Sequence, residues 1–368
     1  MIPKRLAAAT LTVDLGALAD NWRRLNDLTG RAETAAVVKA DAYGLGIGHA
    51  APVLAAAGCR TFFTALGHEG AEVRRAAPGA RVFVLNGVMA GAEADFVEED
   101  LLPVLNDLHQ IGRWRDHAAR MGRRLGCAIH IDTGMTRLGL LGEAVERLAA
   151  DPSLLDGLDV QLLITHPACA DIPDHELNAR QLAMFHERAA RLPKIPLSAA
   201  NSPAIFLGPE WHLDLVRPGV ALYGSNPSPL CRGAMKPVVH LKARILQVHE
   251  IARERTIGYG ATHMLRAPQR IATCGVGYGD GYLRSLGNRG FGMLAGRRVP
   301  LVGRVSMDLI TFDISGVPET EVGPETEISL IGGGVDIDEL AAKGDTIAYE
   351  LLTGLGARYA RDYVGASA

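Results

Sequence analysis

Short apolar runs alternate with amphipathic segments through the first two-thirds of the chain. Eight apolar or β-branched runs lie at 34–38, 61–65, 82–85, 103–105, 128–131, 161–165, 195–200 and 214–216, and all but one of them end abruptly in polar residues. The segments between them, such as 18–28, 108–121 and 177–191, have the apolar spacing of helices that cover a sheet. Eight strands alternating with helices over roughly 220 residues predict a (β/α)8 barrel, and a doubly wound parallel sheet is the alternative.

The pattern changes at about residue 237. Strands are predicted at 238–248, 270–275, 298–302, 309–314 and 327–331, joined by turns rich in Gly, Pro and Asp, and two short helices at 338–343 and 346–352. A strand at 10–13 fits either part of the chain. We therefore expect a barrel domain at residues 11–235 and a mostly-β domain at 236–368 that also includes residues 1–10.

Composition excludes several classes of protein. A net charge of -3 gives no electrostatic basis for binding nucleic acid or an anionic membrane. No stretch approaches the apolar length of a membrane span. The five cysteines are scattered and never spaced as CxxC, and the histidines form no HExxH set, so we expect reduced thiols, no bound metal and a cytoplasmic protein.

Polar side chains follow nearly all of the predicted barrel strands. They are Lys39, Asn86, Asn106, Asp132 with Arg137, His166, Asn201 with Ser202, and Arg217. The carboxyl ends of barrel strands form the face on which active sites are built. A lysine buried at this face has a lowered pKa and supplies a nucleophilic amine, although a lysine extended to solvent at the barrel rim fits the sequence equally well.

The last two predicted strands of the barrel lead into segments suited to phosphate. Residues 201–203 (NSP) resemble a helix start whose free N–H groups suit an anion. Residues 217–220 (RPGV) contain Gly219, which lets backbone N–H groups approach a ligand. No P-loop is present, and no GxGxxG follows a strand and opens a helix. An amine and a phosphate site at one barrel face indicate pyridoxal phosphate as the cofactor.

Motifs along essentially the whole chain resemble those of the alanine racemases. They are 37–46 (VVKADAYGLG), 132–137 (DTGMTR), 165–166 (TH), 200–202 (ANS), 217–224 (RPGVALYG), 258–262 (GYGAT), 277–281 (GYGDG), 303–308 (GRVSMD) and 348–350 (AYE). The resemblance implies a pyridoxal-phosphate enzyme that interconverts L- and D-alanine and supplies D-alanine for peptidoglycan. It also implies a homodimer in which each active site is shared between subunits.

The resemblance also assigns roles to individual residues. Lys39 would hold the cofactor and act as one catalytic base, and Tyr259 of the other subunit would be the opposing base. Cofactor contacts would come from Tyr43, His166, Asn201, Ser202, Arg217, Gly219, Val220 and Tyr349. Arg137 and the backbone of Met307 would bind the substrate carboxylate, and the entrance would be formed by Asp171, Tyr278, Arg284 and Arg304. Without the family motifs, the sequence around Tyr259 and His166 would indicate structural roles for both residues.

The chemistry explains these residue types. Racemisation needs a base on each face of the substrate, one to remove the α-proton and one to return a proton. Arg217 stays protonated, so it can only donate a hydrogen bond to the cofactor's pyridine nitrogen. His130 departs from the family, because many members carry at this position a carbamylated lysine that positions the carboxylate-binding arginine. Because histidine cannot carry the carbamate, a bound anion or another acidic side chain would have to position Arg137.

Other activities remain open from the sequence. A serine or broad-specificity racemase is the nearest alternative, because a pocket separates such small substrates by only about 10- to 200-fold. A non-catalytic pyridoxal-phosphate carrier would lack the second domain. A decarboxylase of basic amino acids would need a charged side-chain pocket and an acid, not Arg217, at the pyridine. A catabolic role for D-alanine is also open.

Overall fold

The computed structural model describes residues 2–323 and 325–365, which form two compact units. The barrel unit comprises residues 18–222 and 226–236, and the β unit comprises the remaining described residues. The predicted combination of a (β/α)8 barrel with a mostly-β domain is confirmed. Within the described residues, none of the helices has both the length and the apolar character needed to cross a membrane.

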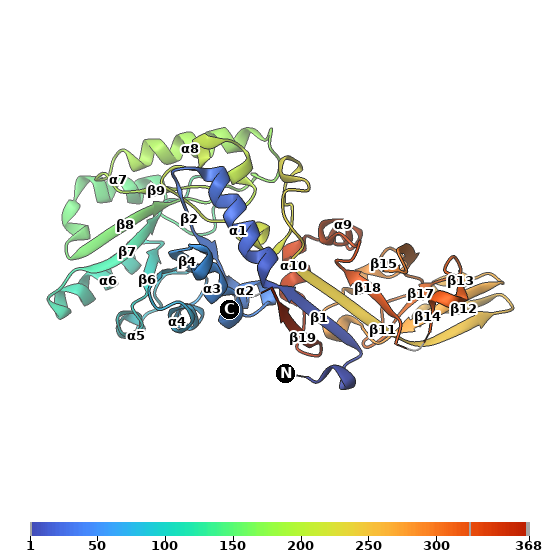
Figure 1. The fold of residues 1–368 in the computed structure, drawn as a ribbon. Coiled ribbons are helices and arrows are strands. Elements are labelled where there is room, and N and C mark those ends of the chain that lie inside the picture. The colour runs from blue at the N-terminus through green and yellow to red at the C-terminus, as the bar shows by residue number, and fades with distance from the viewer. Residues whose placement is uncertain (1, 324, 366–368) are drawn as a thin grey trace. The chain divides into compact units, whose positions relative to one another are not determined.

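Strands and helices alternate around the barrel unit (Figure 1). Its strands are β2 (Glu33–Thr34), β3 (Ala36–Val37), β4 (Thr61–Thr64), β5 (Arg81–Val84), β6 (Leu102–Leu105), β7 (Leu125–His130), β8 (Leu158–Ile164), β9 (Leu197–Ser198) and β10 (Leu215–Val216). Its helices are α1 (Leu15–Thr29, which begins in the β unit), α2 (Lys39–Gly44), α3 (Ile47–Ala57), α4 (Gly67–Ala76), α5 (Glu93–Glu98), α6 (Leu108–Met121), α7 (Gly142–Ala150) and α8 (Glu176–Ala189).

Parallel pairing closes the strands into a barrel. Strands β3 to β9 pair in sequence order, and β10 pairs in parallel with β2. Between β9 and β10, the Arg217 N–H donates to the Ala200 carbonyl at 2.9 Å. The predicted strand at 34–38 is interrupted into β2 and β3, but both parts continue the ring, because the Val37 N–H donates to the Pro218 carbonyl at 2.9 Å. All eight strand ends therefore belong to one barrel.

Helix α6 shows how the sequence determines where a barrel helix begins, where it ends and which face it buries. The Asp107 side chain accepts a hydrogen bond from the Gln110 N–H at 2.7 Å and caps the start of the helix. Gly122 ends it in the left-handed conformation with φ 61°. Ile111, Trp114 and Ala118 are spaced along one face and are buried, while the opposite face is polar. The predicted bounds of this helix match the structure.

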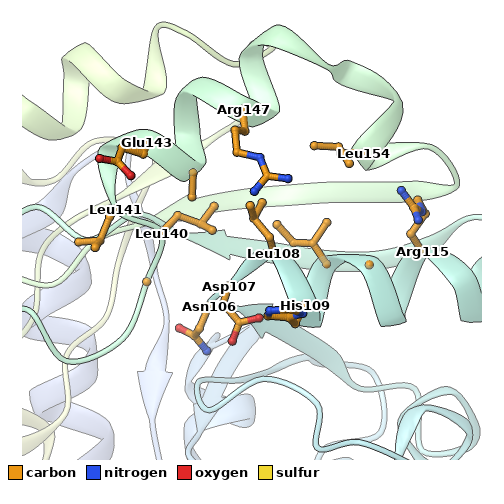
Figure 2. A pocket seen from close by; sticks show the side chains of 14 residues that line it. Asn106, Asp107, Leu108, His109, Arg115, Leu140, Leu141, Glu143, Arg147 and Leu154 are labelled. Carbon is orange, nitrogen blue, oxygen red and sulfur yellow. The ribbon is translucent and has the colours of Figure 1, made fainter.

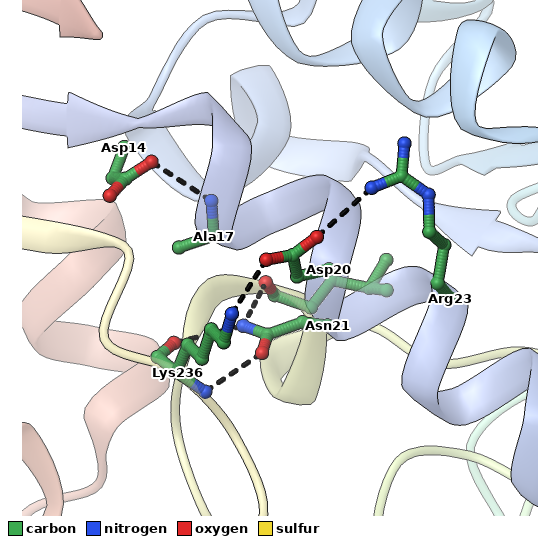
Figure 3. A network of polar contacts seen from close by, with 7 residues as sticks. Asp14, Ala17, Asp20, Asn21, Arg23 and Lys236 are labelled. Carbon is green, nitrogen blue, oxygen red and sulfur yellow. Dashed lines mark hydrogen bonds and ion pairs between the residues drawn. The ribbon is translucent and has the colours of Figure 1, made fainter. Parts of the chain in front are cut away.

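A polar network ties the end of the barrel unit to α1 (Figure 3). The Asn21 side chain donates to the Lys236 carbonyl at 2.9 Å and accepts from the Lys236 N–H at 2.8 Å. It also donates to the Leu222 carbonyl at 3.1 Å. The Lys236 ammonium lies 2.6 Å from the Asp20 carboxylate and lowers its pKa. Because Asn21 is buried, these bonds fix the path of the chain as it leaves the barrel.

The β unit is built on an eight-stranded sheet. Its elements are β1 (Ala9–Asp14), β11 (Val239–Ile251), β12 (Arg255–Ile257), β13 (His263–Leu265), β14 (Gln269–Cys274), β15 (Phe291–Leu294), β16 (Arg297–Pro300), β17 (Ile310–Asp313), β18 (Glu327–Ile331), β19 (Ala360–Val364), α9 (Ile337–Lys343) and α10 (Ala348–Gly354). Strand β1 pairs antiparallel with β11 and parallel with β19. The strand expected at 10–13 therefore lies in the sheet of this unit.

The sequence pattern did not predict four strands of the β unit, namely β12, β13, β15 and β19. Strand β15 contains Gly292, which weakens the signal of a strand. The glycine is required there, because an added Cβ would lie 2.5 Å from Ile328 Cγ2 on the neighbouring strand. Strands β12 and β13 are three residues each, too short to show alternation.

Candidate functional site

Lys39 lies two residues after the end of strand β3 and begins an unusual turn. Ala40, Asp41, Ala42 and Tyr43 all have left-handed backbone conformations, with φ between 52° and 57°. This conformation costs about 1–2 kcal/mol for each residue that carries a side chain. Such strain persists where the surrounding structure imposes it, and it concentrates at functional sites.

Glu69 on helix α4 holds this turn, although no motif of the sequence singled it out. One carboxylate oxygen accepts from the Ala40 N–H at 2.7 Å, and the other accepts from the Ala65 and Leu66 N–H groups at 2.9 and 3.1 Å. The side chain is buried, so the three bonds are shielded from water. Glu69 thus fixes the backbone that carries Lys39.

The surroundings of Lys39 favour a neutral amine. Burial lowers the pKa of its ammonium, and the positive charge of Arg137 lowers it further, while Glu69 acts in the opposite direction. A lowered pKa raises the fraction of unprotonated amine at neutral pH. Lys39 is half-buried, so its exposure lies between the two interpretations that the sequence left open, while the lowered pKa is the property that the reactive lysine requires.

Tyr43, Ser202 and Gly219 converge to form a cradle. The buried hydroxyl of Ser202 accepts hydrogen bonds from the Gly219 N–H at 2.8 Å and the Ala221 N–H at 3.2 Å. An added Cβ on Gly219 would lie 2.2 Å from the Tyr43 hydroxyl oxygen, so only glycine leaves room for that phenol. Two backbone N–H groups, which here donate to Ser202, and two hydroxyls therefore gather at one place, where an anion could take over the N–H donors from the Ser202 oxygen.

The helix start expected at residues 201–203 differs in detail. Only a short 3-10 turn forms, at Ala204–Phe206, and the side chain of Asn201 rather than Ser202 accepts from the Ala204 N–H at 3.1 Å. The Ser202 hydroxyl is instead engaged with the Gly219 segment. The anion-binding character of this region thus rests on the cradle, and not on a helix N-terminus.

Arg217 is fixed by the ends of strands β8 and β9. One terminal nitrogen of the buried guanidinium donates to the Ser198 carbonyl at 2.9 Å, and the other donates to the Thr165 carbonyl at 2.6 Å. Burial lowers the pKa of Arg217 to about 10, so the side chain is still a cation at neutral pH. A rigid positive charge is therefore built into the barrel unit.

Two histidines near this cation are held neutral. Burial lowers the pKa of His166 well below its ordinary value, and the charges of Arg217, Arg137 and Lys39 act in the same direction. Burial likewise lowers the pKa of His130 to about 4, with Arg217 and Arg137 contributing. The shared influence of Arg217 and Arg137 places the two imidazoles in one electrostatic environment with Lys39.

The loop that carries Arg137 is closed at its base. The Leu140 N–H donates to the His130 carbonyl at 2.8 Å, and the Asp132 N–H donates to the Leu140 carbonyl at 3.0 Å. One carboxylate oxygen of Asp132 accepts from three consecutive N–H groups, those of residues 134–136, at 3.0 Å each. One oxygen of Asp132 is thus engaged by the backbone of this loop, and the Arg137 side chain itself is exposed.

In the β unit, Tyr259 and Met307 lie on exposed turns. Tyr259 follows β12 between two glycines with φ 72°, and its side chain is 71% exposed. An added Cβ on Gly260 would lie 3.0 Å from the Arg304 guanidinium, so Arg304 packs against the Tyr259 turn. The Tyr278 N–H donates to the Ser306 carbonyl at 3.0 Å, beside Met307. The structure thus gathers Tyr259, Arg304, Tyr278 and Met307 around the segment 303–307.

The other predicted residues are more scattered. Asp171 is exposed in the loop that follows β8, and Arg284 begins a 3-10 turn at Arg284–Leu286. Tyr349 is half-buried near the start of α10. Val220 is buried next to Gly219.

A cavity of about 570 Å³ lies between helices α6 and α7 (Figure 2). Leu108 and Leu140 lie on one side of it, and the guanidinium of Arg147 points into it. None of the residues to which the sequence assigns a catalytic or binding role lines this cavity. Asn106 and two residues of the Arg137 loop, Gly139 and Leu140, line it, whereas Lys39 and the cradle residues do not.

Comparisons with known proteins agree along the whole chain. Residues 13–227 match the alanine racemase N-terminal domain and residues 238–363 match its C-terminal domain. An alanine racemase of Rhodospirillum rubrum is 52% identical, covering 98% of this chain and 96% of its own. A catabolic alanine racemase of Agrobacterium fabrum is 45% identical, covering 97% and 92%. The crystal structure of alanine racemase from Bartonella henselae with covalently bound pyridoxal phosphate superposes with a TM-score of 0.93 at 35% identity, covering 97% of this chain and 100% of its own. The chain therefore belongs to the alanine racemase family.

Proposed function

We propose that this chain interconverts L- and D-alanine with pyridoxal phosphate as its cofactor. The observation that carries the proposal is the placement of Lys39, half-buried and with a lowered pKa, in the same barrel unit as the cradle of Tyr43, Ser202 and Gly219. Its membership of the alanine racemase family supports the reaction, and the solved relative with covalently bound pyridoxal phosphate supports the cofactor.

The residues of the barrel unit fit this cofactor. The hydroxyls of Tyr43 and Ser202 and the backbone at Gly219 and Val220 would hold its phosphate, with Asn201 shaping the turn. Tyr349, which belongs to the β unit, would add a further hydroxyl. Arg217, locked by its carbonyl partners, would donate to the pyridine nitrogen. When bound, the cofactor supplies an electron sink that acidifies the α-hydrogen of the amino acid.

Lys39 and Tyr259 would exchange protons with the substrate's α-carbon from opposite faces. The lowered pKa of Lys39 favours the unprotonated amine that can accept a proton near neutral pH. Tyr259 stands on an exposed turn of the β unit, where it is free to reach a second subunit, and we infer a homodimer whose sites are shared. Neutral His166 would lie against the cofactor without adding charge.

The remaining assignments concern substrate binding. Arg137 and the backbone of Met307 would bind the carboxylate of alanine. The charge of Arg137 already acts on Lys39, His130 and His166, which supports its placement near the reacting groups. Asp171, Tyr278, Arg284 and Arg304 would form the entrance.

Exchange of the α-hydrogen in deuterated solvent tests the reaction and its substrate together. With wild-type protein, L-alanine and D-alanine should each exchange and racemise, and a panel including serine would define the specificity. The Tyr259→Phe variant should lose racemisation but retain exchange from one enantiomer, because one base remains. A Tyr259→Phe variant that racemises at the wild-type rate would contradict the two-base assignment.

We further propose that the D-alanine serves peptidoglycan synthesis in the cytoplasm. The five cysteines are all unpaired, which is typical of a reducing compartment. Catabolism of alanine is the alternative, and relatives from Agrobacterium fabrum carry both a catabolic and a biosynthetic name. Deletion of the gene separates the two roles, since loss of a biosynthetic enzyme makes growth depend on added D-alanine.

A further inference from the structure

Helix α8 buries two amides on the face where a barrel helix ordinarily presents apolar side chains. Its buried residues are Asn178, Gln181, Phe185 and Ala189. Gln181 is completely buried, and burying a polar side chain is unfavourable unless its donors and acceptors find partners. The partners of Gln181 therefore indicate what this side chain does.

The amide of Gln181 binds the backbone on both sides of Pro167. Its Oε1 accepts a hydrogen bond from the Ala168 N–H at 2.8 Å, and its Nε2 donates to the His166 carbonyl at 3.1 Å. Because a backbone N–H can only donate and a carbonyl can only accept, these partners fix the orientation of the amide. One side chain thus holds the carbonyl of His166 and the next backbone N–H along the chain.

The segment that Gln181 holds has no regular structure of its own. Strand β8 ends at Ile164, and residues 165–167 belong to no helix or strand. In a parallel sheet, one residue bonds a carbonyl and an N–H that lie two positions apart on the neighbouring strand, and Gln181 does the same for His166 and Ala168. The side chain from α8 therefore replaces a strand neighbour at the point where β8 stops.

The other end of this segment is tied to Arg217. The Thr165 carbonyl accepts a hydrogen bond from the Arg217 guanidinium at 2.6 Å. The Thr165 hydroxyl lies 2.7 Å from the Thr133 hydroxyl, which in turn accepts from Gln181 Nε2 at 3.2 Å. These side chains are all buried, so their hydrogen bonds are shielded from water. The backbone of His166 is consequently held between Arg217 on one side and Gln181 on the other.

We propose that Gln181 is a positioning residue that holds His166 against the pyridoxal phosphate ring, in a fixed place relative to Arg217. The inference rests on the proposed function, in which His166 and Arg217 both contact this ring. Gln181 acts through the backbone of His166, because both ends of its amide are engaged there. Without the amide, the His166 carbonyl and the Ala168 N–H lose their partner, and the imidazole is free to move with the backbone.

The affinity for pyridoxal phosphate tests this role without measuring turnover. Cofactor-free wild type, Gln181→Leu and His166→Ala would be titrated with pyridoxal phosphate and followed by absorbance. Gln181→Leu should weaken binding about 10-fold, which corresponds to the loss of about one hydrogen bond. It should also shift the absorbance maximum of the bound cofactor in the same direction as His166→Ala. A folded Gln181→Leu with the affinity and spectrum of wild type would overturn the proposal. Gln181→Met, which fills a similar volume, takes its place if the leucine variant does not fold.

A double-mutant cycle separates positioning from a general loss of stability. If Gln181 acts through His166, then Gln181→Leu should weaken cofactor binding no further in a protein that already carries His166→Ala. A merely structural role predicts the same loss of affinity in both backgrounds, about 10-fold each time, and that result would refute the proposal.

Asn178 supplies the matched control, because it is a buried amide on the same face of α8. Its Nδ2 donates to the Ile172 and Pro173 carbonyls at 3.0 and 3.3 Å, beyond the segment that carries His166. Asn178→Leu should therefore leave the affinity for pyridoxal phosphate and the absorbance of the bound cofactor unchanged. Equal losses of affinity in Asn178→Leu and Gln181→Leu would show that any damage to α8 has this effect, and would also overturn the proposal.

The same titrations distinguish this proposal from the function on which it rests. A wild-type protein that neither binds pyridoxal phosphate nor racemises alanine would contradict the proposed function itself. A His166→Ala variant with wild-type affinity and spectrum would remove the role of His166, and the proposal for Gln181 would fall with it.

Discussion

Replacing Gly219 with alanine puts a methyl group where the phenol of Tyr43 lies. The added Cβ would be 2.2 Å from the Tyr43 hydroxyl oxygen and 3.1 Å from Cζ. Carbon contacts are comfortable from about 3.5 Å, so the phenol must retreat by roughly 1 Å. Tyr43 is buried and ends the run of left-handed residues held by Glu69, which leaves it little freedom to move.

Overpacking of this kind costs about 1–3 kcal/mol. If the loss falls on the site for the phosphate, the affinity for pyridoxal phosphate should drop by about 5- to 150-fold. Gly112 on helix α6 is the matched control, because an added Cβ there meets no atom within 4 Å and its φ is ordinary. Alanine at that position should leave cofactor binding unchanged and stabilise the helix by up to about 1 kcal/mol.

The assay is titration of cofactor-free protein with pyridoxal phosphate, followed by absorbance, for wild type and both variants. Thermal unfolding of the cofactor-free proteins identifies any general loss of stability. A folded Gly219→Ala that binds pyridoxal phosphate as tightly as wild type would refute the assignment of Gly219 and Tyr43 to the phosphate site.

Two further predictions concern buried polar groups. Because the pKa of His130 falls from 6.5 to about 4 on folding, the unfolded chain binds the proton more readily between these values, and stability is lost as the pH falls. The part of the loss that is due to His130 should reach about 3 kcal/mol between about pH 7.5 and about pH 4, as measured by urea unfolding. His130→Gln should remove this part and leave the part due to His166, and equal pH slopes for the two proteins would contradict the shift. Glu69→Ala leaves three N–H groups without their acceptor, so the free energy of unfolding, measured from the urea midpoint, should fall by at least about 2 kcal/mol. An unchanged midpoint would show that the turn after Lys39 is stable without Glu69.

The barrel and its polar face could be predicted from the sequence, because both follow from local patterns. Each buried strand shows as an apolar run, and each run ends where the barrel presents side chains to its active face. Lys39, Arg217 and Ser202 could be singled out in this way. The residue types alone did not separate reactive from structural positions, and the family motifs were needed to choose Tyr259 and His166.

The features that escaped prediction depend on distant contacts. The left-handed turn at residues 40–43 contains no glycine or asparagine, and it is held by Glu69, far along the chain. The neutral state of His130 likewise depends on burial and on two arginines brought close by folding. The sequence did not predict strand β15 because the strand contains Gly292. The neighbouring strand leaves no room for a side chain at this position.

Lys39 and Tyr259 are proposed to meet in one active site across two subunits, and subunit mixing tests this directly. Lys39→Ala and Tyr259→Phe would each be inactive alone. In randomly mixed dimers, half of the dimers combine both variants, and each of these has one site with neither substitution. A shared site therefore predicts recovery of about a quarter of the wild-type racemase activity. If the mixture is as inactive as its parents although mixed dimers form, the two groups do not come from different subunits and the two-base site as proposed is wrong.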